Sequence, residues 1–334
     1  MPIDVLAGEL HFVDHLAPIY TALPDDVRGD FVVIRTRMSG DSAAMIERAR
    51  RRGIEITTEL SEDNRPTLVA SYGDLKAARN LGRRRFATIE HGIGQSFIDS
   101  RHGSYAGGIG RDDVSLFLTP NQHSANRWRH SYPGAMVAVV GCPKLDQLPM
   151  RSPGPGPVVA ISFHWNGGHP PETSGAWNEY RPYLATLAHN FTVIGHGHPR
   201  YLSNLARYYK RVRIPVVEDF EDVCRQADVY VCDTNSTIYE FASTGRPVVL
   251  MNKPGRNGYR KDMEHGLRFW SAAHVGIQVD RPGDLPDAIT RALLDPPVQQ
   301  RAREDALNIV YAFRSGGAQR AAAALTAWYR KVAP

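Results

Sequence analysis

The sequence predicts an α/β fold with two domains, each built around a parallel sheet. The chain has 334 residues, a length that suits two domains of ordinary size. Short apolar segments alternate with segments of helical period along most of it, a pattern typical of β-α units. The alternation stops at Met150–Pro157, where three Pro and two Gly in eight residues indicate a linker. We therefore expect an N-terminal domain at 1–149, a linker at 150–157, a C-terminal domain at 158–315 and a last helix at 316–334. This last helix can pack back on the N-terminal domain.

The first half contains seven apolar segments of strand length. These expected strands are 3–6, 31–35, 54–57, 67–71, 85–89, 114–118 and 137–140, and the helical segments between them include 41–52, 73–81 and 121–130. Gly53 follows the Arg-rich end of the helical segment 41–52, as expected for a helix C-terminus.

The second half repeats the pattern after the linker. Its expected strands are 158–163, 191–194, 214–217, 229–232, 247–251 and 275–279, and its expected helices are 176–189, 202–211, 220–226, 236–244, 284–294, 299–313 and 316–331. Ligands of such sheets bind at the carboxyl ends of the strands, so the residues that follow each strand are the first candidates for function.

Composition and charge exclude several classes of protein. The hydrophobic fraction of 42% is that of a globular chain, and no stretch approaches the roughly 20 apolar residues of a membrane span. Residues 1–6 lack a basic leader before an apolar run, so no secretory signal is expected. The three Cys lack C-x-x-C spacing, which favours free thiols in a reducing cytoplasm. A net charge of +5 favours anionic ligands.

Residues 228–252 form the most informative segment. A buried strand ends at Asp233, and the following turn leads into a helix that carries Glu240; the turn residues are Thr234, Asn235, Ser236 and Thr237. Hydroxyls and backbone N–H groups at a helix N-terminus suit a pyrophosphate, and Glu240 can accept hydrogen bonds from ribose hydroxyls. The alternative is that Ser236 and Thr237 only cap the helix and Asp233 only satisfies the turn.

A second candidate segment, 195–200, follows the strand at 191–194. His198 can stabilise a departing diphosphate, and Arg200 can bind it through two hydrogen bonds. His196 and His198 also form an H-x-H pair that can bind Zn or Mn, although no carboxylate or Cys follows at ligand spacing. A pair of histidines without function in a loop is the third interpretation.

A third candidate segment ends the strand at 85–89. His91, beside Gly92, is placed for general-base catalysis, and Glu90 either orients it or faces solvent. A structural histidine is the alternative, equally supported by the spacing.

Weaker candidates remain elsewhere in the sequence. His11 and His15 share a helix face, for which we prefer packing, and His164 begins a Gly-rich loop at 164–169 that either touches a ligand or is a mobile solvent loop. The arginines at 48, 50–52 and 83–85 are either a phosphate-backbone footprint or, as we prefer, a solvated basic face. The sequence has no P-loop, G-x-G-x-x-G after a first strand, G-x-S-x-G or H-E-x-x-H motif.

Taken in order, these pieces resemble the CDP-glycerol glycerophosphotransferases of teichoic-acid synthesis, within the GT-B group of nucleotide-sugar enzymes. The matching pieces are His91-Gly92, the segment 141–146 (GCPKLD), His198-Pro199, the segment 233–236 (DTNS), and Glu240 with Gly245-Arg246-Pro247. The resemblance implies a GT-B-like fold of two Rossmann-like domains facing across a cleft, with the acceptor on the first domain and the donor nucleotide on the second.

The resemblance also implies a role for each matching residue. His91 is similar to the family's catalytic His, His198 to its donor-diphosphate His, Ser236 and Thr237 to its phosphate-binding hydroxyls, and Glu240 to its ribose-binding acid. The implied enzyme is a transferase without cofactor or metal. It moves a sugar or glycerol-phosphate group from a CDP- or UDP-linked donor to an acceptor hydroxyl.

The sequence departs from the family at two places, which leaves the transferred group open. Ile93 to Ser96 stand where the family has Pro and Lys, and Thr234 to Ser236 stand where it has Tyr-Ser-Ser. The acceptor is a glycan, a lipid-linked intermediate, a metabolite or modified DNA. The rival interpretations are an enzyme similar to UDP-N-acetylglucosamine 2-epimerase and a non-catalytic nucleotide-sugar binding protein.

Overall fold

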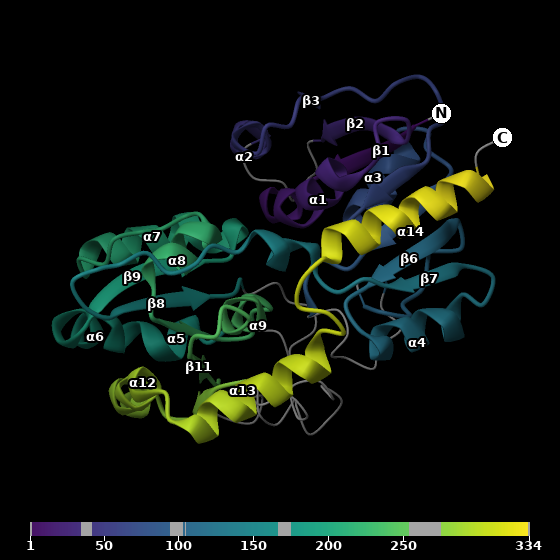
Figure 1. Ribbon diagram of the computed structural model, residues 1–334. Helices are drawn as coiled ribbons and strands as arrows, with labels where there is room; N and C mark the ends of the chain where they lie inside the picture. Colours follow the sequence, from purple (N-terminus) through teal and green to yellow (C-terminus); the bar gives the residue numbers. More distant parts are fainter. Residues whose placement is uncertain are drawn as a thin grey trace. The chain divides into compact units, whose positions relative to one another are not determined.

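The computed structural model describes residues 2–34, 42–93, 103, 105–165, 175–253 and 275–332 (Figure 1). Contacts divide the chain into two compact units. Unit 1 comprises Met1–Gln147 and Tyr311–Pro334, and unit 2 comprises Leu148–Val310. The chain therefore passes between the units twice, once after Gln147 and once after Val310.

Unit 1 is built on a seven-stranded sheet with the order β3-β2-β1-β4-β5-β6-β7. Every adjacent pair is parallel, and Val5 in the middle of the sheet aligns with Phe31 of one neighbour and Leu68 of the other. The strands are β1 (Ile3–Ala7), β2 (Arg28–Val33), β3 (Ile56–Thr57), β4 (Thr67–Val69), β5 (Phe86–Ile89), β6 (Val114–Thr119) and β7 (Met136–Val139).

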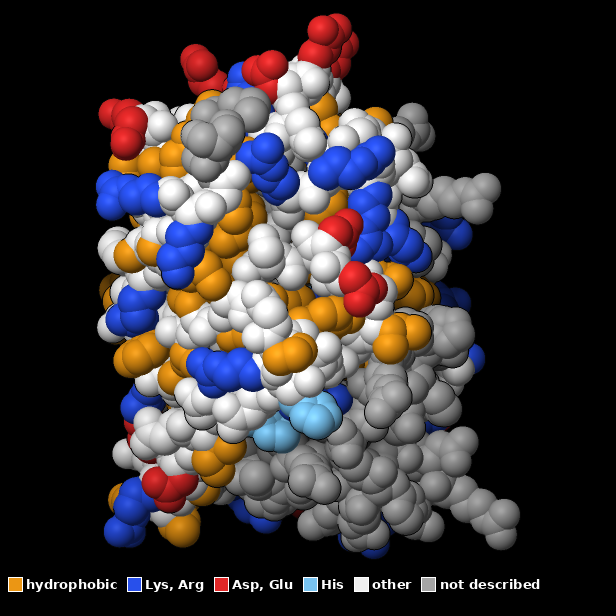
Figure 2. Space-filling view, turned by 90° about the vertical axis from the view of Figure 1, so that its right-hand side faces the viewer, with side chains coloured by type: hydrophobic (Ala, Val, Ile, Leu, Met, Phe, Trp, Pro, Cys, Tyr) orange, Lys and Arg blue, Asp and Glu red, His pale blue; other side chains and the backbone are white. Residues whose placement is uncertain are grey.

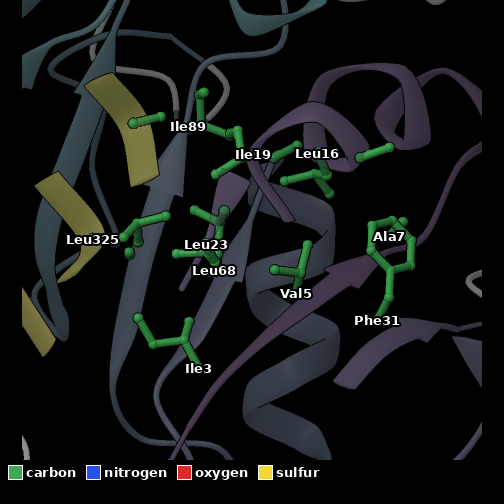
Figure 3. Close-up of a cluster of buried hydrophobic side chains, with 14 of the residues drawn as sticks. Ile3, Val5, Ala7, Leu16, Ile19, Leu23, Phe31, Leu68, Ile89 and Leu325 are labelled. Carbon is green, nitrogen blue, oxygen red and sulfur yellow. The ribbon is translucent and has the colours of Figure 1, made fainter. Parts of the chain in front are cut away.

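Helices cover both faces of this sheet. One face packs against α1 (Leu10–Ala22), α2 (Ser42–Arg51) and α14 (Gly317–Val332), and the other against α3 (Tyr72–Asn80) and α4 (Gln122–Ser131). Alternation along β1 explains the two layers, because Val5 belongs to the first core and Leu6 to the second. Figure 3 shows the first core, where Ile3 and Val5 of β1 lie near Leu325 of α14.

The last helix completes unit 1 although it is far away in sequence. Figure 1 draws α14 in yellow. This helix contacts α1. Trp328 is 1% exposed, and its Nε1 donates to the Ser115 hydroxyl at 2.9 Å. Arg85 donates to the carbonyl oxygen of Val332 at 2.8 Å. The first core is therefore closed by residues from both ends of the chain.

Unit 2 is built on a five-stranded parallel sheet with the order β12-β11-β10-β8-β9. The strands are β8 (Val158–Phe163), β9 (Thr192–Gly197), β10 (Val229–Cys232), β11 (Val248–Met251) and β12 (Ile277–Val279). The helical elements include α5 (Trp177–Tyr180), η4 (Arg181–Tyr183), α6 (Leu184–Asn190), α7 (Pro199–Arg211), α8 (Phe220–Gln226), α9 (Thr237–Ala242), α12 (Leu285–Leu294) and α13 (Pro297–Val310).

Two expected elements of unit 2 differ from the structure. The single helix expected at 176–189 is three short pieces, α5, η4 and α6, and Pro182 lies in the middle one, where a proline cannot donate an intrahelical hydrogen bond. The strand expected at 214–217 is reduced to one bridge between Gly195 and Val216.

The segment expected as a linker lies at the start of unit 2 and bonds to it. Arg151 pairs with Asp228 at 3.0 Å, and the Ser152 N–H donates to the Arg225 carbonyl at 2.8 Å. The hinge role of 150–157, and the placement of the two domains across a cleft, stay predictions.

Candidate functional site

In unit 1 the candidate site lies where the parallel strands end. His91 follows β5 by two residues, and Ala70 directly follows β4, the strand beside it. The Nδ1 atom of His91 lies 2.5 Å from the Ala70 carbonyl oxygen. A carbonyl can only accept, so Nδ1 carries the proton and the neutral ring keeps its lone pair on Nε2. This hydrogen bond sets the tautomer that a general base acting through Nε2 requires.

The turn after β5 suits this placement. Gly92 has a φ of +79°, a conformation that other residues rarely adopt, and it lets the chain turn directly after His91. Gly92 is buried, whereas His91 keeps partial exposure. The expected continuation of the loop at 94–96 lies outside the described residues.

Helix α1 surrounds His91 with aromatic rings. The Phe12 ring centre lies 4.5 Å from that of His91, His11 lies at 5.6 Å and His15 at 6.4 Å. The helix begins after the carboxyl end of β1, so His11 and His15 share the sheet edge that carries His91. We expected these two residues to serve packing; His15 is buried, and the structure also places both rings beside the candidate base.

His15 is the most buried member of the group. Burial lowers the pKa of His15 well below its usual value, and the charges of Lys144 and His91 act in the same direction. Lys144 is itself 6% exposed, and it lies in the 3-10 turn Pro143–Gln147 after β7. The thiol of Cys142 lies 4.0 Å from the His15 Nδ1. The lowered pKa of His15 favours its neutral form beside the buried Lys144.

Of the two environments expected for Glu90, the one facing solvent is wrong, and its role in orienting His91 stays a prediction. It is 7% exposed, so it does not face solvent. Its Oε1 atom accepts hydrogen bonds from the Ser124 hydroxyl and, at 3.0 Å, from the Trp128 Nε1. Both donors belong to α4, so Glu90 ties the end of β5 to that helix.

The prediction of a solvated basic face is wrong for two of its arginines. Arg48 is 5% exposed and pairs with Asp14 at 2.8 Å, and Arg83 is 2% exposed and pairs with Asp4 at 2.6 Å. Neither guanidinium is available to a phosphate backbone. Figure 2 shows that Lys and Arg side chains on the face in view are scattered among hydrophobic and uncharged ones.

In unit 2, His198 caps the helix that follows β9. Its Nδ1 accepts a hydrogen bond from the backbone N–H of Arg200 at 3.2 Å, and Pro199 occupies the first position of α7. A backbone amide can only donate, so Nδ1 is unprotonated in the neutral ring and Nε2 carries the hydrogen. The tautomer is the reverse of that of His91: His198 presents a donor, which suits an oxyanion.

Three further side chains gather around His198. The His164 ring lies edge-on to it with ring centres 5.0 Å apart, and the Trp165 ring centre lies at 6.0 Å. The Arg200 guanidinium lies over the Trp165 ring at 4.6 Å. The structure therefore brings together His164, His198 and Arg200 at the carboxyl ends of β8 and β9, and adds Trp165 to them.

Asp233 holds the loop after β8 in place. It is 1% exposed, and its two carboxylate oxygens accept the backbone N–H groups of His164 at 2.8 Å and Ala176 at 2.9 Å. Burial raises the pKa of Asp233 to about 6, against the lowering effect of these bonds. A side chain on Gly175 would meet the Asp233 carboxylate at 2.9 Å and the His164 carbonyl at 2.7 Å, so only glycine fits there.

The other residues expected to bind a donor divide by exposure. Asn235 is 7% exposed and Glu240 is 1% exposed, whereas Ser236 and Thr237 are partly exposed. The helix that they begin, α9, is six residues long, and Ser236 makes no side-chain cap. The Thr237 hydroxyl lies 2.8 Å from the Tyr230 hydroxyl. His198 and Arg200 are also partly exposed, and Arg200 is the cationic side chain among the expected donor-binding residues.

His196 has an internal partner. It is 5% exposed, and its Nδ1 lies 2.9 Å from the carbonyl oxygen of Val217, so it ties β9 to the segment after α7. Within the described ranges, no group of three or more His, Cys, Asp and Glu residues is arranged to hold a metal ion. The three Cys are free and buried. None of the helices in these ranges is long and apolar enough to cross a bilayer.

Sequence reasoning missed several residues of the site. The i, i+4 spacing of His11 and His15 was the available signal, but only the fold shows that this helix face meets His91. Ala70 gave no signal, because it acts through its backbone. Lys144 lies in the matching segment 141–146, but the sequence assigned it no role.

Comparisons with solved structures give the same architecture. No protein-family model matches the sequence, and no curated protein sequence matches it. The chain is similar to S. aureus MnaA in complex with UDP, with a TM-score of 0.63 and 14% identity over 99% of this chain and 97% of that chain. It is similar to UDP-GlcNAc 2-epimerase from Neisseria meningitidis bound to UDP-GlcNAc, with a TM-score of 0.58 and 12% identity over 99% of this chain and 100% of that chain.

The wall teichoic acid polymerase TagF is a third similar structure. Its TM-score is 0.60, with 11% identity over 100% of this chain and 90% of that chain. At these identities the likeness shows the fold. The expected fold class, a GT-B-like α/β protein with two parallel-sheet units, is confirmed.

Proposed function

We propose that this chain is a transferase that moves a sugar or glycerol-phosphate group from a nucleoside-diphosphate donor to an acceptor hydroxyl. The observation that carries the proposal is the pair of opposite tautomers. His91 in unit 1 holds a lone pair on Nε2, and His198 in unit 2 holds a hydrogen there. A transfer to a hydroxyl needs one group of each kind, a base for the acceptor and a donor for the leaving phosphate.

His91 supplies the base. Its Nε2 takes the proton of the acceptor hydroxyl as the acceptor oxygen forms its new bond. The hydrogen bond from Nδ1 to Ala70 stabilises the imidazolium that results, because the carbonyl oxygen accepts more strongly from a cationic donor. Partial exposure of His91 leaves its ring accessible to a substrate.

His198 and Arg200 supply the positive counterpart in unit 2. The Nε2–H of His198 and the guanidinium of Arg200 bind the phosphate oxygens that gain charge as the donor bond breaks. The first N–H groups of α7, a helix of 13 residues, add a partial positive charge at the same place. Asp233 contributes by fixing the His164 backbone and touches no substrate in this proposal.

The leaving group shows which group is transferred. If the acceptor attacks a sugar carbon, the leaving group is a nucleoside diphosphate. If it attacks the distal phosphorus of CDP-glycerol, the leaving group is a nucleoside monophosphate. The structures of TagF support the second reaction, and the UDP-bound structures support a UDP-linked donor. We propose no metal and no cofactor for either, and the acceptor includes glycans, metabolites and modified DNA as candidates.

A second candidate function is epimerisation of a UDP-linked amino sugar. The similar structure from Neisseria meningitidis is a UDP-GlcNAc 2-epimerase bound to UDP-GlcNAc, and that of MnaA holds UDP. One observation favours it, the position of Glu9. Glu9 is 6% exposed, and its Oε2 atom lies 3.9 Å from the Nδ1 atom of His11. Both residues lie at the sheet edge that carries His91. This carboxylate is the acid-base partner that the sequence alone did not suggest.

One experiment separates these functions. CDP-, UDP-, GDP- and ADP-linked donors are first ranked by thermal shift, since ligand binding to the native state raises the melting temperature. The best donor is then incubated in D2O with and without acceptors. Acceptor-dependent release of nucleotide supports the transferase, and deuterium at C2 of the recovered sugar supports the epimerase. Binding without either reaction contradicts both and leaves a nucleotide-sugar binding protein.

A further inference from the structure

A small pocket in unit 2 has a chemistry that the candidate site does not use. It has a volume of about 340 Å³, and we call it the α7 pocket; its lining residues are Trp177, Arg181, Asn204, Arg207, Tyr208 and Arg211. Three of the six are arginines, and none is acidic. We propose that the α7 pocket binds the phosphate group of a small organic phosphate ester.

The wall of the pocket is held in place before any ligand binds. The Tyr208 hydroxyl donates to the Arg181 carbonyl oxygen at 2.8 Å, which fastens η4 to α7. The Trp177 ring lies edge-on to Tyr208 with ring centres 5.3 Å apart. The Arg211 guanidinium lies over the Tyr208 ring at 4.6 Å. One of the three cations is therefore already oriented, which lowers the entropy cost of binding.

The charges of the pocket are uncompensated in the part of the chain that the structure describes. No ion pair joins Arg181, Arg207 or Arg211 to a carboxylate among those residues, and all three are exposed. Arg207 and Arg211 are one turn apart on α7, a spacing at which like charges destabilise a helix. The C-terminal dipole of α7 favours Arg211 but leaves Arg181, on another element, unexplained. An anion in the pocket would compensate all three.

The donors match a phosphate better than other anions. A guanidinium presents a planar pair of N–H groups that binds two phosphate oxygens at once, and three of them can satisfy one phosphate dianion. Asn204 adds an amide donor on the same face of α7. The volume is at the lower end of ligand pockets, which fits a phosphate with a short organic group.

The α7 pocket is separate from the proposed donor site. Arg200 belongs to the first turn of α7, and the pocket residues of this helix begin one turn later, at Asn204. The pocket's two arginines on α7, 207 and 211, lie roughly 10 and 16 Å from Arg200 along the helix axis. The same helix would then offer a phosphate site at each end, and the test must distinguish them.

The 334-residue chain is titrated with glycerol 1-phosphate and, separately, with inorganic phosphate. Calorimetry measures the affinity, and the NMR signals of the arginine Nε–H groups report which arginines the ligand contacts. The pocket variant is R207S/R211S. The matched control is R291S/R301S, which removes two exposed arginines from α12 and α13 and changes the net charge equally. R200S reports on the donor site. Circular dichroism checks that each variant is folded.

We expect the Arg207 and Arg211 signals to shift, and R207S/R211S to weaken the binding that these signals report at least about tenfold, while the R291S/R301S control retains the wild-type affinity. In R200S the Arg207 and Arg211 signals should still shift, even if binding at the donor site is lost. Tighter binding of the ester than of inorganic phosphate identifies the ester as the ligand, and equal binding identifies the phosphate group alone; both support the site. Equal weakening in the control, loss of the Arg207 and Arg211 shifts in R200S, or no shift at millimolar ligand overturns it. None of these results depends on whether the chain is a transferase.

Discussion

The Nδ1 atom of His91 lies 2.5 Å from the carbonyl oxygen of Ala70, which joins the ends of two adjacent strands through one side chain. Because strand ends in a parallel sheet have fixed spacing, this bond fixes the ring as well as its tautomer. The first prediction concerns the base that this geometry creates.

Replacing His91 by Ala is expected to lower kcat by about 10²–10⁴, the usual contribution of a positioned general base. Steady-state kinetics with the donor chosen by thermal shift measure the effect. His130→Ala is the control, since His130 is an exposed histidine on α4 of the same unit. A kcat within a factor of a few of wild type in His91→Ala would remove the base from the mechanism.

Exchanging His198 tests the leaving-group side while keeping the helix cap. His198→Ser retains an oxygen that can accept the Arg200 N–H, so α7 keeps its N-cap. The serine has no Nε2–H to donate to the donor phosphate, and kcat should fall by about 10²–10³. Thermal melting should show little change. If only KM rises, the side chain contributes to ground-state binding and not to the transition state.

The sequence predicted the strands that carry a continuous apolar run. Ile3 to Ala7 are all buried, with Asp4 as the one polar residue among them, and such a strand packs in a sheet that is covered on both faces. Val229–Cys232 is a second example, with the same burial pattern. For these elements the local composition and the tertiary environment both favour a buried strand, so the hydrophobic pattern alone predicts them.

The predictions that missed the environment of a residue did so because its partners are distant in the sequence. Arg48 and Arg83 looked like surface charges, because their partners Asp14 and Asp4 are far away in sequence. His15 looked like a packing residue, because Lys144 reaches it only through the turn after β7. Local spacing predicts which residue types stand at a strand end, but the three-dimensional pairing of strands decides which of them meet.

The ion pair between Arg83 and Asp4 gives a stability prediction. Both side chains are at most 2% exposed, and burial raises the pKa of Asp4 while Arg83 lowers it. Arg83→Met would leave the buried Asp4 carboxylate with Arg65, at 3.4 Å, as its remaining ion-pair partner. We expect the free energy of unfolding to fall by up to about 3–5 kcal/mol, the cost of breaking a buried pair. Urea denaturation followed by tryptophan fluorescence measures the change.

Arg84→Met is the matched control for that variant. Arg84 is the next residue along the chain, it is exposed, and its change in side chain is identical. We expect a change within about 0.5 kcal/mol, as for most surface substitutions. If both variants lose the same free energy of unfolding, the ion pair between Arg83 and Asp4 does not account for the loss in Arg83→Met.

The buried His15 should make unfolding depend on pH in the mildly acidic range. Its pKa is lowered in the folded protein by burial first, then by Lys144 and His91. The unfolded chain therefore binds a proton at about pH 6.5 that the folded chain refuses, and stability falls as the pH decreases below that value. The slope contributed by one group approaches about 1.4 kcal/mol per pH unit.

His15→Gln removes the titrating ring and should flatten this dependence between about pH 6.5 and 5. His130→Gln, an exposed histidine of the same unit, should leave the wild-type slope unchanged. Urea unfolding at several pH values measures all three proteins. The comparison also bears on the site, because burial, and after it Lys144 and His91, lower the pKa of His15 beside the candidate base. An unchanged slope in His15→Gln would mean that another buried group takes up the proton, and that His15 is not neutralised by its surroundings.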